Sequence, residues 1–179
     1  MLFHRDKNVL IVATKLQTAT NLVKKIKAIH KNLPAWLKIA KISVDNRTSF
    51  ELSNGSQVKA SSTSGDAGRS EAVSLLVVDE AAFVEGMDEL WAGLYPTLST
   101  GGRCIALSTP NGVGNWFHKT YVESVEEKNN FTNMVLPWDV HPERDQEWFD
   151  KETRNMSRRE IAQELECNFN ASGETVIHG

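Results

Sequence analysis

The run Leu75-Leu76-Val77-Val78-Asp79-Glu80 carries the strongest structural signal in this 179-residue chain. Four apolar residues that end abruptly in two adjacent carboxylates predict a buried parallel strand with acids at its carboxyl end. Open α/β sheets bind their ligands at that end of the strands. One acid there can hold Mg²⁺, usually through water, and its neighbour can polarise an attacking water. The run therefore predicts an α/β sheet with a hydrolytic site at one edge.

A second run, Arg103-Cys104-Ile105-Ala106-Leu107-Ser108-Thr109, repeats this plan with hydroxyls at the tip, and Ser108 lies 28 residues after Glu80. In a parallel sheet the two tips can lie side by side. Together the runs look like the Walker B and sensor strands of a P-loop NTPase. No G-x-x-x-x-G-K-[S/T] occurs in the 179 residues, so the matching Walker A loop is absent from them. The sequence carries the acid-and-sensor half of a nucleotide site without its phosphate cradle.

Strands that alternate with amphipathic helices predict a three-layer, doubly wound, mostly parallel α/β sheet, incomplete at its N-terminus. The strands are expected at residues 8–14, 39–44, 49–52, 57–60, 75–80, 103–109 and 131–136. The helices are expected at residues 16–29, 87–98, 115–125, 146–155 and 157–166. Asn54-Gly55 predicts a tight hairpin, and Ser157-x-x-Glu160 predicts a capping box at the start of the last helix.

Charge is unevenly distributed along the chain. Residues 1–41 contain nine Lys or Arg and a single acid, Asp6, although the whole chain has a net charge of −3. Such asymmetry can mark a surface that faces nucleic acid. The alternative is the solvent side of an amphipathic helix, on which Lys24, Lys25, Lys27 and Lys31 fall. No apolar run approaches the roughly 20 residues that span a bilayer, so no membrane association is expected.

The two cysteines and five histidines indicate no metal site. Cys104 and Cys167 lie far apart without a CxxC partner, and the histidines are scattered. We expect Cys104 to be a reduced, buried residue of a core strand.

The ordered motifs resemble the large terminase subunit of tailed bacteriophages in its T4-like branch, the ATPase motor that packages DNA into proheads. An apolar strand that ends in Asp-Glu is shared with helicases and many other ATPases. The specific part is its combination with Ser108-Thr109-Pro110-Asn111-Gly112, Gln163-Glu164 and Phe169-Asn170-Ala171-Ser172-Gly173. The family's subunit is longer at both ends, with an adenine-binding segment and P-loop before this region and a nuclease after it. The resemblance implies that residues 1–179 are a partial ATPase domain of the P-loop NTPase (ASCE) type, ending near the linker to an absent nuclease domain.

The resemblance also implies roles for four residues at the strand tips. Asp79 would anchor the Mg²⁺ that accompanies ATP, and Glu80 would orient or deprotonate the hydrolytic water. Ser108 and Thr109 would sense the γ-phosphate and pass hydrolysis on to the parts that move DNA. The alternatives are a solvated turn or helix cap for the acids, and an ST-turn before Pro110 for the hydroxyls.

Arg69 is a candidate arginine finger. It lies ten residues before Asp79 in a Gly/Ser-rich loop, where members of the family carry an arginine thought to reach the ATP of the neighbouring subunit in trans. The planar, permanently charged guanidinium suits phosphate oxygens. The alternative is a surface arginine that pairs with Asp66 or Glu71.

The predicted function is part of the ATP-hydrolysing motor that translocates viral DNA into a prohead, inactive alone because the P-loop is missing. The implied cofactors are ATP and Mg²⁺. The implied partners are double-stranded DNA, the portal protein, the small terminase subunit and further copies in a ring. The implied location is the cytoplasm of the infected bacterial host, outside the finished virion. Two alternatives stay open: a helicase-like DNA-dependent ATPase, and a non-catalytic remnant or assembly module.

Overall fold

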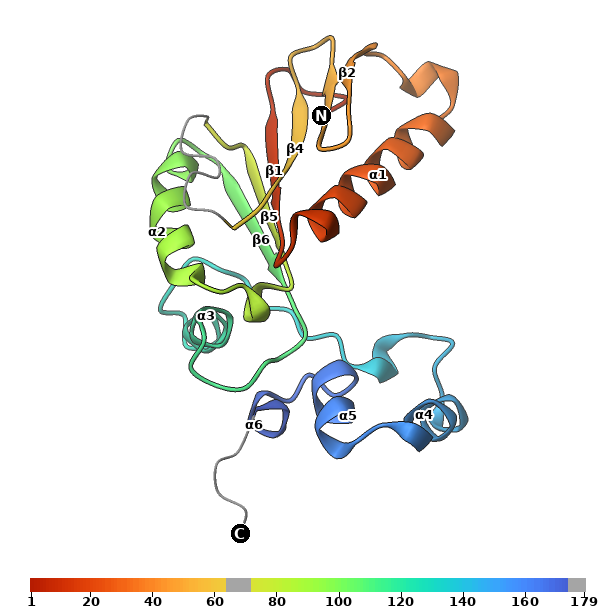
Figure 1. Cartoon of the computed structure of the whole chain (residues 1–179), viewed down its shortest axis with the longest axis vertical. Helices are drawn as coiled ribbons and strands as arrows, with labels where there is room; N and C mark the ends of the chain where they lie inside the picture. Colours follow the sequence, from red (N-terminus) through yellow and green to blue (C-terminus); the bar gives the residue numbers. More distant parts are fainter. Residues whose placement is uncertain (64–71, 174–179) are drawn as a thin grey trace. The chain divides into compact units, whose positions relative to one another are not determined.

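The computed structural model describes residues 1–63 and 72–173. The chain forms two compact units, Met1–Leu107 and Ser108–Gly179. The first unit contains a six-stranded sheet in the order β2-β3-β4-β1-β5-β6 (Figure 1). The strands are β1 (Asn8–Val12), β2 (Ile42–Asp45), β3 (Ser49–Leu52), β4 (Gln57–Ser61), β5 (Leu75–Asp79) and β6 (Arg103–Leu107).

The sheet is mostly parallel, as predicted. Strands β4, β1, β5 and β6 run parallel to one another, whereas β2, β3 and β4 are joined in antiparallel pairs. The turn between β3 and β4 is the predicted hairpin at Asn54-Gly55. Gly55 has φ +81°, a left-handed conformation that glycine adopts without steric strain. The Asn54 side chain accepts from the Ser56 N–H at 3.0 Å and donates to the Met1 and His4 carbonyls, which also ties down the N-terminal segment.

A helix lies on each face of the sheet in the first unit (Figure 1). Helix α1 (Leu16–Asn32) packs on one face, against β1, β3 and β4, and α2 (Met87–Leu98) covers the other face (Figure 1). Ile11 of β1 and Val58 of β4 form a buried cluster with Val23 of α1. Side chains that point to the opposite face of the sheet, such as those of Leu76 and Val78, are completely buried on the α2 side. Coverage on both faces explains why the central strands are apolar at consecutive positions.

The second unit is helical in its described part. Its helices are α3 (Trp116–Val125), α4 (Gln146–Glu152), α5 (Arg158–Glu164) and α6 (Phe169–Ser172). Single 3₁₀ turns lie at η1 (Ala35–Leu37) and η2 (Ala81–Phe83) in the first unit, and at η3 (Trp138–Val140) and η4 (Thr153–Asn155) in the second. The predicted capping box of α5 is present, with Ser157 and Glu160 each accepting the other's backbone N–H.

The strand predicted at residues 131–136 is wrong. This segment forms neither helix nor strand, and Met134 and Leu136 are 78% and 64% exposed. A strand needs a neighbouring strand for its backbone hydrogen bonds, and all the strands of the described residues lie in the first unit. The apolar residues of this segment match a strand pattern, but the described part of the second unit contains no strand with which they could pair.

Both cysteines are free. Burial raises the pKa of the Cys104 thiol, in β6, to about 12, so this thiol stays neutral at physiological pH. In the part of the chain that the structure describes, no helix combines the length and the apolar character that crossing a membrane requires.

Candidate active site

Asp79 and Glu80 lie at the carboxyl end of β5. Asp79 is the last residue of the strand and is in register with Leu107, the last residue of β6. On the other side of β5, Val78 is in register with Val12, the last residue of β1. Because these three strands are parallel, the acids stand between two further strand ends at one edge of the sheet, as the sequence predicted.

The backbone turns sharply at Glu80. This residue has φ 53° and ψ 43°, a left-handed conformation that is uncommon for a residue with a Cβ. Its N–H donates to Oδ1 of Asp79 at 3.1 Å, and the chain then enters η2, where Ala81 and Ala82 are buried. Such a conformation costs about 1–3 kcal/mol, and residues of this kind concentrate at functional sites. The turn leaves the Glu80 side chain exposed while the following chain returns to the core.

Thr14 holds the Glu80 carboxylate. Its Oγ1 donates to Oε2 of Glu80 at 3.3 Å, across 66 residues of sequence. Thr14 lies just beyond the end of β1, at the same sheet edge as the acids. Thr14 was not among the site residues predicted from the sequence. Its position could have indicated a site role, because Thr14 ends the apolar run of residues 8–14 as Asp79 ends the run that starts at Leu75.

Ser108 and Thr109 follow β6 directly and begin the second unit. The contact that places Thr109 lies within that unit. Its Oγ1 donates to Oε1 of Glu164 at 3.4 Å, and the same oxygen accepts from Nε2 of Gln163 at 2.9 Å. The structure thus brings the predicted sensor threonine to the Gln163-Glu164 motif of α5, a pairing that the sequence did not suggest. Arg69 lies outside the described residues, so its role stays a prediction from sequence.

The donor atoms at the sheet edge fit a magnesium ion. Asp79, Glu80 and Thr14 offer carboxylate and hydroxyl oxygens, which Mg²⁺ prefers as ligands. Among the described residues, no group of three or more His, Cys, Asp or Glu side chains is placed to hold a metal. One carboxylate beside a second fits an ion that takes its remaining ligands from water and from substrate phosphates.

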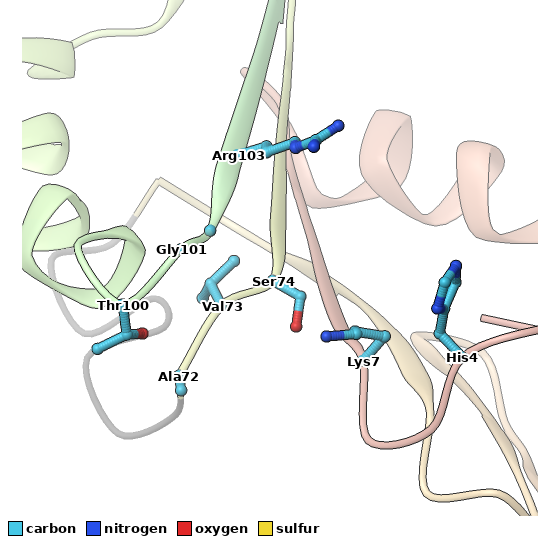
Figure 2. A pocket seen from close by; sticks show the side chains of 9 residues that line it. His4, Lys7, Ala72, Val73, Ser74, Thr100, Gly101 and Arg103 are labelled. Atoms are coloured by element: carbon cyan, nitrogen blue, oxygen red, sulfur yellow. The ribbon is translucent and has the colours of Figure 1, made fainter.

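A cavity lies at the opposite edge of the same sheet. It has a volume of about 400 Å³ and is lined at the amino ends of three strands, by Lys7 before β1, Ser74 before β5 and Arg103 at the start of β6 (Figure 2). The Lys7 side chain points toward Ser74. Because ligands of open α/β sheets bind beyond the carboxyl ends of the strands, this cavity is on the wrong edge for the nucleotide.

Comparison with known proteins identifies the family of the chain and supports its fold. The family model described as "Terminase large subunit, T4likevirus-type, N-terminal" matches residues 1–179. The ATPase domain of the Thermus phage P74-26 large terminase is 22% identical with a TM-score of 0.64, over 94% of this chain and 79% of that one.

Two structures of large terminases are also similar. The large terminase of the thermophilic bacteriophage D6E in complex with ADP is 10% identical with a TM-score of 0.72, over 94% of this chain and 42% of that one. The large terminase of bacteriophage HK97 is 14% identical with a TM-score of 0.65, over 93% of this chain and 40% of that one. At these identities the likeness establishes the P-loop NTPase fold that was predicted. The chain spans less than half of these two large terminases.

Proposed function

Because the chain belongs to the family of T4-like terminase large subunits, we propose that it supplies the acid-and-sensor side of the ATPase that drives viral DNA into a prohead. One observation carries the proposal. Glu80 adopts a strained left-handed turn at the tip of β5, and its exposed carboxylate is held by Thr14 from the neighbouring strand. A plain surface turn does not need a hydrogen bond from a neighbouring strand, whereas a residue that must present a carboxylate to a water benefits from one.

In this proposal the two adjacent acids do different work. Asp79 would hold Mg²⁺, and Glu80 orients the hydrolytic water and accepts its proton. When bound, Mg²⁺ neutralises charge that develops on the phosphate oxygens. Ser108 and Thr109 detect the γ-phosphate, because a hydroxyl can donate to phosphate and accept from a water in one geometry. The ADP complex of the D6E large terminase supports a nucleotide as the ligand.

The 179 residues contain no Walker A loop to bind the phosphates of ATP. Such a loop positions the phosphates with its backbone N–H groups and a lysine. We therefore refer to an ATPase-competent form, in which a Walker A segment accompanies these residues on the same or another polypeptide. Its further partners in our proposal are double-stranded DNA, the portal protein, the small terminase subunit and other copies in a ring, in the cytoplasm of the infected host.

The direct test compares the chain with its ATPase-competent form. Purified 1–179 with Mg²⁺, ATP and DNA should release negligible phosphate, because positioning supplies most of phosphoryl-transfer catalysis. Turnover of about one per second by 1–179 alone, within the ordinary enzyme range, would show that the missing loop is not needed. Failure of the ATPase-competent form to hydrolyse ATP would instead favour the non-catalytic assembly module.

Arg69 completes the proposed machinery as a finger that acts on the neighbouring subunit's ATP. The test mixes Arg69→Ala subunits with Glu80→Gln subunits, each inactive alone, in the ATPase-competent form. Partial recovery of activity is expected, since some interfaces then pair an intact Arg69 with an intact Glu80. An arginine finger can contribute about 10³–10⁵ in rate, so recovery is measurable. No recovery at any mixing ratio, with ring assembly confirmed, would exclude the trans role.

A further inference from the structure

Two sequence motifs that lie 60 residues apart meet in the second unit. The backbone N–H of Gly112, in the Ser108–Gly112 segment, donates to Oγ of Ser172 at 3.0 Å in a buried hydrogen bond. Ser172 is completely buried, and its hydroxyl donates in turn to the Phe169 carbonyl at 2.9 Å. One hydroxyl thus accepts from the loop and donates to its own helix. This contact gives the Ser172-Gly173 pair a role that the sequence motif alone did not reveal.

The two glycines of these motifs set how closely the chains approach. A Cβ added to Gly173 would lie 3.0 Å from Cα of Gly112, and a Cβ added to Gly112 would lie 3.0 Å from Cα of Gly173. The atom met in each case belongs to backbone, which cannot rotate away as a side chain can. Gly112 also has φ +68°, whereas Gly173 has φ −81°, which any residue adopts. At position 173, glycine is therefore favoured by the close approach of the two backbones and not by its φ angle.

We call the contact of Gly112 with Ser172 and Gly173 the seat of the loop. Helix α5 supports this seat and contacts the loop at a second place. Nε of Arg159 donates to the Ser172 carbonyl at 3.0 Å, which ties the end of α6 to α5. At the other end of α5, Glu164 accepts from the Thr109 hydroxyl. The loop is therefore held at Thr109 and at Gly112, three residues apart, by two helices that pack on each other.

We propose that Ser172, Gly173 and Glu164 are positioning residues that seat the sensor loop on α5 and α6. The inference rests on the proposed function, because it needs Thr109 and Ser108 to be the sensors of the γ-phosphate. In this arrangement a displacement of the hydroxyls moves α5 and α6 with it, and a loop without its seat leaves the hydroxyls free to point elsewhere. The seat is a physical link between the sensor and the C-terminal helices.

Ser124 offers a matched control for Ser172. It is also buried in the second unit, and its hydroxyl donates to the Tyr121 carbonyl three residues earlier at 2.7 Å, as that of Ser172 does to Phe169. Ser124→Ala thus removes the same kind of bond within a helix, without touching the sensor loop. Gly173→Ala is the second probe, because its backbone conformation suits alanine and only the spacing to Gly112 is disturbed.

The first measurement uses the 179-residue chain and needs no ATP. Amide hydrogen exchange at Gly112 should become about fivefold faster in Ser172→Ala, since a buried hydrogen bond contributes about 1 kcal/mol net. It should stay within about twofold of the unmutated rate in Ser124→Ala. Unchanged exchange at Gly112 in Ser172→Ala would show that the seat does not form in solution, and would overturn the proposal.

The second measurement uses the ATPase-competent form. Ser172→Ala and Gly173→Ala should each lower kcat about tenfold or more with the KM for ATP unchanged, and Ser124→Ala should leave both values unchanged. A loss of stability alone would not separate kcat from KM in this way. Retained kcat in both variants, with faster Gly112 exchange, would overturn the positioning role while the proposed function stands. Absence of turnover in the unmutated protein would instead sink the proposed function, and this inference with it.

Discussion

Glu80 shows how a single residue joins fold and chemistry. Its left-handed backbone redirects the chain from β5 into the buried η2, and its side chain stays at the sheet edge. Asp79, one position earlier, still belongs to the strand and accepts the Glu80 N–H. The two carboxylates are neighbours in sequence but differ in backbone conformation and in hydrogen-bond partners, which is how one acid can hold a metal while the other acts on water.

In the ATPase-competent form, Glu80→Gln should abolish hydrolysis and leave ATP binding almost intact. The amide keeps the shape of the side chain but cannot accept the proton of the attacking water, a function worth about 10²–10⁴ in rate. Asp79→Asn should instead weaken Mg²⁺-dependent nucleotide binding. Phosphate release and nucleotide titration separate the two effects. Glu85→Gln serves as the control, because Glu85 is exposed nearby and is the nearest substitute base. Full turnover in Glu80→Gln would transfer the catalytic role to another acid.

Thr14→Val should slow hydrolysis without changing ATP affinity. Valine has the same shape but leaves the Glu80 carboxylate without its 3.3 Å hydrogen bond. We expect a two- to tenfold decrease in kcat, roughly the range that one net hydrogen bond provides. Thr14→Ser retains the hydroxyl and should retain the rate, which distinguishes orientation of Glu80 from packing around Thr14. Equal losses in Thr14→Val and Thr14→Ser would assign Thr14 a packing role only.

Sequence patterns found some of these residues and missed others for a physical reason. Asp79 is visible because an acid that ends an apolar run is unusual wherever it occurs. Thr14 and Ser172 matter only through partners that are 66 and 60 residues away. Threonine after a strand and serine in a short helix are unremarkable until the fold brings their partners to them. Residue type and spacing along the chain carry no information about such contacts.

At the scale of elements, local signals succeeded where they did not need a distant partner. The Asn54-Gly55 hairpin and the Ser157–Glu160 capping box form as predicted, since both are closed by residues within a few positions. The predicted strand at residues 131–136 failed because a strand depends on a neighbour that the pattern cannot supply. Strand β5 succeeded because β1 and β6 flank it on both sides.

The capping box makes the start of α5 sensitive to acid. The Ser157 N–H donates to Oε2 of Glu160 at 2.6 Å, and this bond and that of the Ser157 hydroxyl lower the pKa of the Glu160 carboxyl. A carboxyl whose pKa is lower in the folded than in the unfolded state stabilises the fold above its ordinary pKa of 4.5, and that contribution disappears as the pH falls through the folded pKa.

We therefore expect the Ser157 amide to exchange faster, relative to amides in mid-helix, as the pH falls below about 4.5. In Glu160→Gln the neutral side chain still accepts the hydrogen bond, so this pH dependence should vanish. NMR of the Ser157 amide during an acid titration measures both. An amide protected equally at all pH values in the unmutated chain would mean that the Glu160 carboxylate does not cap α5 in solution.

At the scale of the whole molecule, β6 lies at an edge of the sheet and is only partly covered. Ile105 of β6 is in register with Val77, and Val77 packs against the cluster under α1. Yet Ile105 and Leu107 are 53% and 45% exposed, and in the part of the chain described no strand pairs with the outer edge of β6. Parallel sheets are normally covered on both faces, and an open apolar edge strand favours aggregation. A Walker A strand and its helix are the elements that we expect to cover this region.

The isolated 1–179 chain should consequently be only marginally stable, with a low and poorly reversible thermal transition. Replacing Ile105 and Leu107 together by threonine should make the isolated chain more soluble, because it removes exposed apolar surface. The same double variant should destabilise the ATPase-competent form, in which these side chains become buried, by roughly 1.5–3 kcal/mol for each side chain. Ile29→Thr is the control, since Ile29 is exposed on α1 and should behave alike in both forms. Melting curves and solubility limits of the two forms measure these opposite effects. A sharp, reversible transition of 1–179 at high temperature without any partner would show instead that the six-stranded sheet is sufficient by itself.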